Sequence, residues 1–280
     1  MFTFTKQTDL KLHLQSSHSR KSIGFVPTMG ALHQGHLALI KQSLDENMVT
    51  VVSIFVNPTQ FNSADDLKKY PRTFDQDSEK IQNLSNEIIL FAPAVDDMYD
   101  GKAVSDHFEY DGLELQMEGK QRPGHFDGVG TIVKKLFEIV NPAKAYFGEK
   151  DFQQLQIVRK MVENHHLKVE VVGCPIFREK NGLAMSSRNE RLSAQNRAEA
   201  KIIFDTLLKA KTMFGTKSAN HVSDYVENVF KFNDNFKLEY FEIAFEDSLL
   251  PCFENIKNKN CRAFIAVFCG DVRLIDTMRF

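Results

Sequence analysis

The sequence predicts an α/β fold in which a doubly wound, Rossmann-like parallel sheet is followed by a smaller α+β domain. Strand-like apolar runs alternate with helix-like stretches through the first two thirds of the chain. Such alternation favours right-handed crossovers and a parallel sheet with helices on both faces. Beyond about Pro175 the order changes to two helices followed by hairpin-like strands. Because 280 residues are long for one core, we expect two domains, residues 1–176 and 177–280.

Each element of the first domain has a local signal. The run at 48–56 is apolar and rich in β-branched residues, as expected of a strand covered on both faces. The clearest helix is 126–140, where apolar residues recur at steps of three and one until Asn141-Pro142. Residues 95–117 are ambiguous, although alternation at 107–110 suggests a strand. The remaining segments are strands at 22–26, 87–92, 143–147 and 167–172, helices from Leu37 onward and at 151–164, and a charged stretch at 65–80.

The second domain has fewer elements. Helices are expected at 194–214 and 219–232, the first of them capped by Ser193. Strands are expected at 238–245, 261–268 and 272–275, with Gly270-Asp271 as the last turn. Residues 177–191 would form the hinge and the rim that faces the first domain, which makes the second domain a lid.

Composition excludes several classes of function. The 35 basic and 37 acidic residues give a net charge of −2, which argues against nucleic acid or an anionic membrane as a partner and favours small-molecule ligands. The sequence has no apolar stretch of membrane-spanning length. Four cysteines at positions 174, 252, 261 and 269 match no zinc or disulfide pattern, so we expect buried reduced thiols and a cytoplasmic protein.

The stretch at 25–36, Phe-Val-Pro-Thr-Met-Gly-Ala-Leu-His-Gln-Gly-His, turns from a strand into a helix. Such a turn directs backbone N–H groups and the positive end of the helix dipole toward an anion. Gly30 and Gly35 permit close approach, and His33 and His36 share one helix face, where they can donate to phosphate oxygens. The alternative is a plain turn with two surface histidines. The Pro-Thr-Met-Gly lead-in favours a nucleotide-phosphate site.

Other polar loops follow predicted strands, at the edge where open parallel sheets bind ligands. Gln60 follows the second strand, in what is either a ligand contact or an ordinary loop. The segment 148–151 offers N–H groups and the Lys150 ammonium to phosphates, although Asp151 is equally suited to be an N-cap. Only one of Gln153 and Gln154 can face the cleft from a helix.

Three further segments carry charge. Ser186, Ser187 and Arg188 follow a glycine-containing loop and form either an anion clamp or a polar interdomain loop. Arg122, in Arg-Pro-Gly-His-Phe, would add positive charge to the cleft. Residues 70–77, with Asp75 and Asp77, would touch a metal or another subunit, or form a solvated charged segment.

These motifs resemble a known family. The His-x-Gly-His turn and the Met-Ser-Ser-Arg loop are similar to those of the nucleotidyltransferase superfamily, which includes class I aminoacyl-tRNA synthetases. With the segments at 55–61, 70–73, 122–126 and 148–151 in the same order, the sequence resembles the pantoate–β-alanine ligases (pantothenate synthetases), densely over residues 20–192.

The resemblance implies a two-step ligation. Pantoate carboxylate attacks the α-phosphorus of ATP, pyrophosphate leaves, and the β-alanine amine displaces AMP from the pantoyl adenylate. It implies His36 as proton donor, with His33, Lys150 and Arg188 also catalytic. Gln60 and Gln154 match the amides that bind pantoate. The ATP-binding residues that it implies are Met29, Gly30, Ala31, Leu32, His33, Gln34, Gly35, His36, Gly148, Glu149, Lys150, Asp151, Phe177, Met185, Ser186, Ser187 and Arg188.

The resemblance also implies Mg²⁺ with ATP and a homodimer, although the sequence shows no dedicated metal ligands. The family commonly has a small β-branched residue where this chain has Phe177, so either the backbone or the side chain there would contact adenine. One alternative is an adenylyltransferase with a phosphate-bearing acceptor, which needs extra basic residues and lacks the pair Gln60 and Gln154. Another is a catalytically inactive nucleotide-binding regulator, which has no need for the full set of catalytic side chains.

Overall fold

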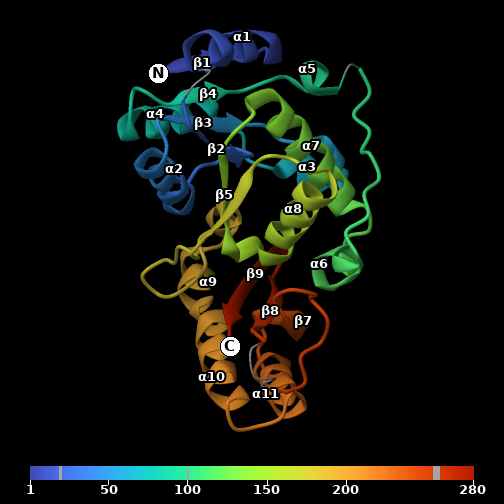
Figure 1. Cartoon of the computed structure of the whole chain (residues 1–280). Coiled ribbons are helices and arrows are strands. Elements are labelled where there is room, and N and C mark those ends of the chain that lie inside the picture. The colour runs from blue at the N-terminus through green and yellow to red at the C-terminus, as the bar shows by residue number, and fades with distance from the viewer. Residues whose placement is uncertain (19–20, 100, 255–258) are drawn as a thin grey trace.

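The computed structural model describes residues 1–18, 21–99, 101–254 and 259–280. It contains a six-stranded parallel sheet, as predicted, in which the strand order reverses between the neighbours β2 and β5 (Figure 1). Ligands bind at such a switch point in doubly wound folds. The strands across the sheet are β1 (Phe2–Phe4), β4 (Ile89–Phe91), β3 (Val49–Ile54), β2 (Ile23–Thr28), β5 (Lys144–Gly148) and β6 (Glu170–Cys174).

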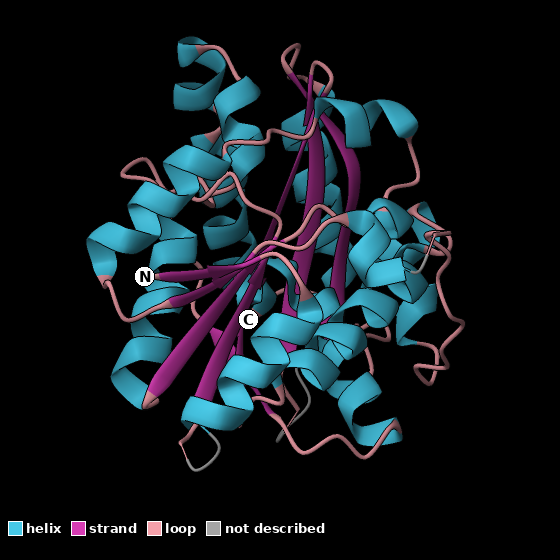
Figure 2. Ribbon diagram, turned by 90° about the horizontal axis from the view of Figure 1, so that it is seen from above, coloured by secondary structure: helices cyan, strands magenta, loops and turns pink. Residues whose placement is uncertain are grey.

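Helices cover both faces of this sheet (Figure 2). Successive strand residues point to opposite faces, so Phe25 and Val51 join one core while their neighbours Val26 and Val52 join the other. The first core is covered by α1 (Gln7–His18), α7 (His125–Val140) and α8 (Phe152–Asn164), and the second by α2 (Gln34–Glu46) and α4 (Phe74–Leu84).

Short helical segments connect the larger elements around the sheet. They are η1 (Pro58–Gln60), α3 (Ala64–Lys69), α5 (Val95–Tyr99), η2 (Leu113–Leu115), α6 (Met117–Gln121), η3 (Glu149–Asp151) and η4 (Ser187–Arg191). Among the described residues, no helix is long and apolar enough to cross a bilayer.

The C-terminal part is α+β, as predicted, and lies below the parallel sheet in Figure 1. Its antiparallel sheet consists of β7 (Phe236–Phe245), β8 (Cys261–Cys269) and β9 (Val272–Arg279), with Gly270 at φ +58° in the β8–β9 turn. Helices α10 (Lys201–Phe214) and α11 (Ala219–Lys231) pack on this sheet in a separate core. Phe264 of β8 instead joins the core of the first domain, so the two parts are packed together.

Several local predictions were wrong. The segment 107–110 is not a strand. The backbone N–H of Phe108 donates to Asp127 Oδ1 of α7 at 3.1 Å and not to a neighbouring strand. The expected helix 194–214 is divided at Ala200 into α9 (Ala194–Glu199) and α10, although Ser193 does cap α9. Strand β1 and helix α1 were not anticipated. Residue 100, in the ambiguous stretch 95–117, lies outside the described residues.

The cysteines correct another expectation. Cys252 and Cys261 form a disulfide, so the prediction of four reduced thiols is wrong for this pair. Both lie against the end of β7, since the N–H of Cys252 donates to the carbonyl of Ile243 and Cys261 pairs with Phe245. Cys174 and Cys269 are free and buried, and burial raises the pKa of the Cys174 thiol to about 11.

Candidate active site

The loops that follow β2, β3, β5 and β6 meet at one edge of the parallel sheet and line a cavity of about 230 Å³. They place His33, Gln60, Lys150 and Phe177 around one space, and residues 185–188 close it from the C-terminal side. Because the carboxyl ends of parallel strands share an edge, segments more than a hundred residues apart contribute to one site.

The loop between β2 and α2 is held in an uncommon backbone conformation. Gly30 and Ala31 have φ values of +80° and +49°, which for alanine is unfavourable without outside support. The support is Asp77 of α4, which is fully buried and accepts the N–H groups of Ala31 at 2.8 Å and Leu32 at 2.7 Å. Lys80, one turn along α4, donates to the carbonyl of Leu32 at 2.7 Å.

This geometry changes the interpretation of the turn. The N–H groups of Ala31 and Leu32 are used by Asp77, and that of Gly30 donates to Thr28 Oγ1 at 3.2 Å. The prediction that these groups face an anion is therefore wrong. What remains for an anion is the start of α2 and the two histidines.

His33 and His36 stack with ring centroids 4.0 Å apart. Burial, followed by the charge of Lys150, lowers the pKa of His33 to about 4. Burial and the neighbouring His33 lower the pKa of His36 well below its ordinary value. Both rings are therefore neutral at pH 7. The backbone N–H of His33 donates to His36 Nδ1 at 3.4 Å, which leaves the His36 proton on Nε2.

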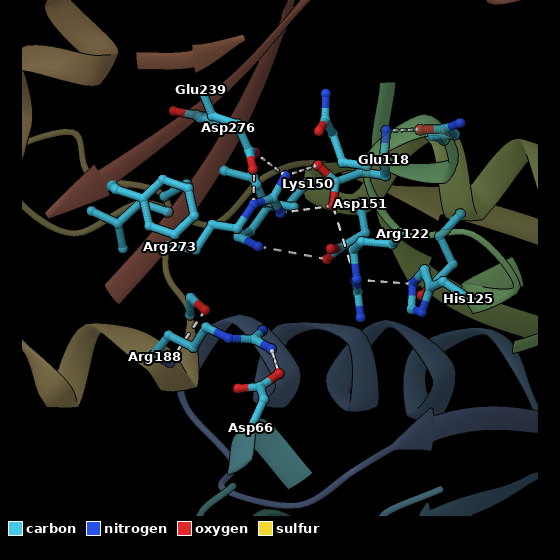
Figure 3. Close-up of a pocket in the computed structure, with 18 of the residues that line it drawn as sticks. Asp66, Glu118, Arg122, His125, Lys150, Asp151, Arg188, Glu239, Arg273 and Asp276 are labelled. Carbon is cyan, nitrogen blue, oxygen red and sulfur yellow. Dashed lines mark hydrogen bonds and ion pairs between the residues drawn. The ribbon is translucent and has the colours of Figure 1, made fainter. Parts of the chain in front are cut away.

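Two cations line the same cavity as the histidines. Lys150 lies in η3 with its ammonium 3.7 Å from Asp151 Oδ2. Arg188 reaches across from η4, and its Nη2 donates to Asp66 Oδ2 of α3 at 3.1 Å (Figure 3). Arg188 is thus paired with a carboxylate in the place where the sequence predicted an anion clamp.

The two glutamines lie on the wall of the same cavity. Gln60 Oε1 accepts from Asn57 Nδ2 at 3.2 Å, and Gln154 lines the cavity from α8. Gln153, in contrast, is buried, and its amide bonds the backbone of Leu113, Gln116 and Glu118. Apolar residues complete the wall: Phe55, Val129, Ile132, Val133 and Leu136. The cavity therefore suits a small ligand with an apolar body and polar ends.

A second cavity of about 450 Å³ adjoins the first and shares with it Lys150, Asp151, Gln154, Ser186 and Arg188. An ion-pair group spans it: Arg273 of β9 donates to both carboxylate oxygens of Glu118 in α6, at 2.8 and 2.7 Å (Figure 3). Tyr240 also donates to Glu118. The two domains are thus joined by charged side chains on two sides of the cleft.

Known proteins resemble this chain over nearly its whole length. Residues 3–279 match the family Pantoate-beta-alanine ligase. The chain is 62% identical over 279 residues to the pantothenate synthetase of Flavobacterium psychrophilum, a match that covers 99% of each chain. The chain belongs to the pantoate–β-alanine ligase family.

Solved structures agree with this assignment. A pantothenate synthetase from Thermus thermophilus superimposes with a TM-score of 0.91 at 39% identity, covering 99% of each chain. A pantoate–β-alanine ligase from Francisella tularensis, whose structure is described as complexed with Beta-gamma ATP and β-alanine, gives a TM-score of 0.78 at 32% identity over 99% of this chain and 97% of that one.

The chain is accordingly an AMP-forming ligase that uses ATP to join pantoate to β-alanine, through a pantoyl adenylate. This outcome disfavours the adenylyltransferase and the inactive regulator. Not every residue implied for ATP by the ligase family lines the two cavities: of the described side chains, Leu32 is buried in the core, Gln34 is exposed, and Glu149 accepts from Arg262 at 3.1 Å. Phe177 is half-exposed at the rim, and its carbonyl accepts the N–H of Met185.

Sequence reasoning missed the residues that hold the loop between β2 and α2 of this ligase but lie far from it along the chain. Asp77 and Lys80 were part of a stretch interpreted as charged and solvated, yet they hold the backbone of Ala31 and Leu32. No pattern separated Asp77 from Asp75, which is exposed in the same helical turn. Asp77 therefore became recognisable only from its burial.

Proposed function

We propose that ATP lies over the start of α2, with its phosphates between the histidines, Lys150 and Arg188, and that pantoate occupies the smaller cavity. The observation that carries this proposal is the convergence of His33, His36, Lys150 and both glutamines on one space. In a nucleotide complex Arg188 would exchange Asp66 for phosphate oxygens, since a guanidinium pairs with either anion in the same way.

The proposed position of pantoate is based on the residues that line the smaller cavity. Gln60 and Gln154 each offer an amide that both donates and accepts, which suits a hydroxyl or a carboxylate. The apolar side chains of α7 line the same cavity, where the methyl groups of pantoate would be buried. This arrangement orients the carboxylate toward the α-phosphorus and excludes water from the anhydride that forms.

The chemistry requires charge stabilisation more than a protein nucleophile. Pantoate oxygen forms the new bond to the α-phosphorus while the bond to pyrophosphate breaks. The Nε2–H of neutral His36 donates to a phosphate oxygen, and the incoming negative charge raises the pKa of both imidazoles toward proton donation. The neutral β-alanine amine then attacks the adenylate carbonyl, AMP leaves with the electron pair of the broken C–O bond, and the nitrogen releases one proton to solvent.

Further proposals rest on the family resemblance. We propose that Mg²⁺ arrives with ATP, because the described residues contain no cluster of three or more His, Cys, Asp or Glu side chains suited to a metal, and phosphate oxygens commonly hold Mg²⁺. We also propose the domain division 1–176 and 177–280 with a lid role for the second domain, a homodimer, and a cytoplasmic location. Sedimentation analysis tests the dimer.

The role of His36 is tested by exchange of labelled pyrophosphate into ATP, which requires pantoate but not β-alanine. His36→Ala slows this exchange by roughly 10²-fold or more, because a donor at the phosphates is lost. His221→Ala, an exposed histidine of α11, serves as the control and exchanges normally. A His36→Ala protein that is folded and exchanges at the normal rate would show that His36 only shapes the turn.

A further inference from the structure

Residues 122–124 join α6 to α7, and the side chains of Arg122 and of His125, the first residue of α7, converge on one atom. His125 Nδ1 lies 2.7 Å from the backbone carbonyl oxygen of Gln60, and Arg122 Nη2 donates to the same oxygen at 3.2 Å. Arg122 Nη1 also lies 3.1 Å from His125 Nε2. Figure 3 shows the two side chains next to each other. The three groups form a closed hydrogen-bonded triangle.

This triangle determines the protonation state and the tautomer of the His125 imidazole. His125 is 6% exposed, and burial followed by the charge of Arg122 lowers its pKa to about 4. In the neutral ring, Nδ1 carries the hydrogen and donates to the Gln60 carbonyl, because Nε2 has to accept from Arg122. Arg122 cannot act as an acceptor, so the opposite tautomer would leave a donor facing a donor.

The backbone nitrogen and the side-chain amide of Gln60 are also held in place by their neighbours. A Cβ on Gly128 of α7 would lie 2.4 Å from the carbonyl oxygen of Thr59 and 2.7 Å from the nitrogen of Gln60, so only glycine permits this approach of helix and loop. Asn57 Nδ2 donates both to the Gly128 carbonyl at 3.0 Å and to Gln60 Oε1 at 3.2 Å. The backbone and the side-chain amide of Gln60 therefore have one place relative to α7.

We propose that Arg122 and His125 are positioning residues that hold the Gln60 carbonyl and thereby place the Gln60 amide for pantoate. The inference rests on the proposed role of Gln60 in binding pantoate. It assigns to Arg122 a task different from the one that its charge suggests. Two of its N–H groups contact the Gln60 carbonyl and the His125 imidazole. We therefore expect its replacement to weaken the use of pantoate and not the binding of the ATP phosphates.

The test compares the apparent kcat/KM for each of the three substrates in His125→Ala and His125→Asn. Loss of both bonds in His125→Ala lowers kcat/KM for pantoate by about 10-fold or more, since a small displacement of an orienting group is costly. Asparagine can place an N–H near the position of Nδ1, so His125→Asn recovers most of that loss. His221→Asn is the matched surface control.

Which substrate is affected distinguishes a positioning role of Arg122 and His125 from direct binding of a substrate. With ATP or β-alanine as the varied substrate and pantoate saturating, His125→Ala changes KM by less than about 2-fold, because binding of those substrates does not use Gln60. Arg122→Met follows the same pattern. If Arg122 instead binds phosphate or the β-alanine carboxylate, its variant raises KM for ATP or β-alanine, and that result would overturn the proposal.

A double-mutant cycle decides whether the effect passes through Gln60. In a Gln60→Ala background, where there is no amide left to place, adding His125→Ala changes kcat/KM for pantoate by less than about 2-fold. An undiminished loss in that background would show that His125 acts by another route. Should Gln60→Ala alone leave kcat/KM for pantoate unchanged, the proposed role of Gln60 fails, which is a separate result. Urea unfolding of each variant confirms that the proteins compared are folded.

Discussion

Replacement of Asp77 by asparagine removes the charge that holds the loop before α2. The carboxylate accepts the N–H groups of Ala31 and Leu32 and the hydroxyl of Thr73, at 2.7 to 3.1 Å, with no exposed surface. Hydrogen bonds to a charged group contribute about 1.5–3 kcal/mol each. Asparagine keeps one acceptor and turns an NH₂ group toward the other N–H, so the free energy of unfolding falls by about 2–4 kcal/mol.

The same substitution displaces the loop before α2, because Ala31 at φ +49° relaxes once its partner is lost. We expect pantoate-dependent pyrophosphate exchange to fall by about 10²-fold, as a misplacement near 1 Å can cost that much. The assays are urea unfolding and exchange measured at saturating ATP. Asp75→Asn is the matched control, because Asp75 lies in the same turn of α4 and is exposed.

The reasoning is refuted if Asp77→Asn unfolds within about 0.5 kcal/mol of wild type, which is the range of ordinary surface substitutions. It is also refuted if the variant is destabilised as expected but exchanges pyrophosphate at the wild-type rate. If Asp77→Asn does not fold, Thr73→Val removes a single bond to the same carboxylate and should cost about 1.5 kcal/mol, the lower end of the range for a bond to a charged group, with a smaller loss of exchange.

Two further predictions concern charge. Asp66→Asn frees Arg188 from its 3.1 Å partner and should lower KM for ATP by up to about 5-fold, as expected for a partly exposed ion pair; an unchanged or higher KM contradicts the exchange of partners. The pKa values of His33 and His125 are lowered to about 4, so between pH 4 and 6.5 the unfolded chain binds more protons and stability rises with pH. Urea unfolding from pH 4.5 to 7.5 should show this rise, with a shallower slope in His33→Gln; equal slopes in the two proteins would contradict it.

Much of the fold could be predicted because its signals are local. Burial of a strand on both faces requires a continuous apolar run, as at 48–56, and an amphipathic helix requires the spacing seen at 126–140. The wrong strand at 107–110 had the right alternation, but the N–H groups of Phe108 and of the preceding Asp106 donate to side chains of α7. Strand β1, with three residues at the edge of the sheet, is too short to produce a pattern.

Within the site, the sequence alone determined the order of the polar loops, the two histidines and the residue types that we propose bind phosphate. Only the tertiary structure separated buried Asp77 from exposed Asp75, since the bond between Asp77 and Leu32 joins residues 45 positions apart. It also decided that both histidines are neutral, because a pKa depends on the charges and the solvent around a ring. Motifs are determined by neighbours along the chain, whereas burial and electrostatic environment are determined by neighbours in space, and the chemistry of this ligase depends on both.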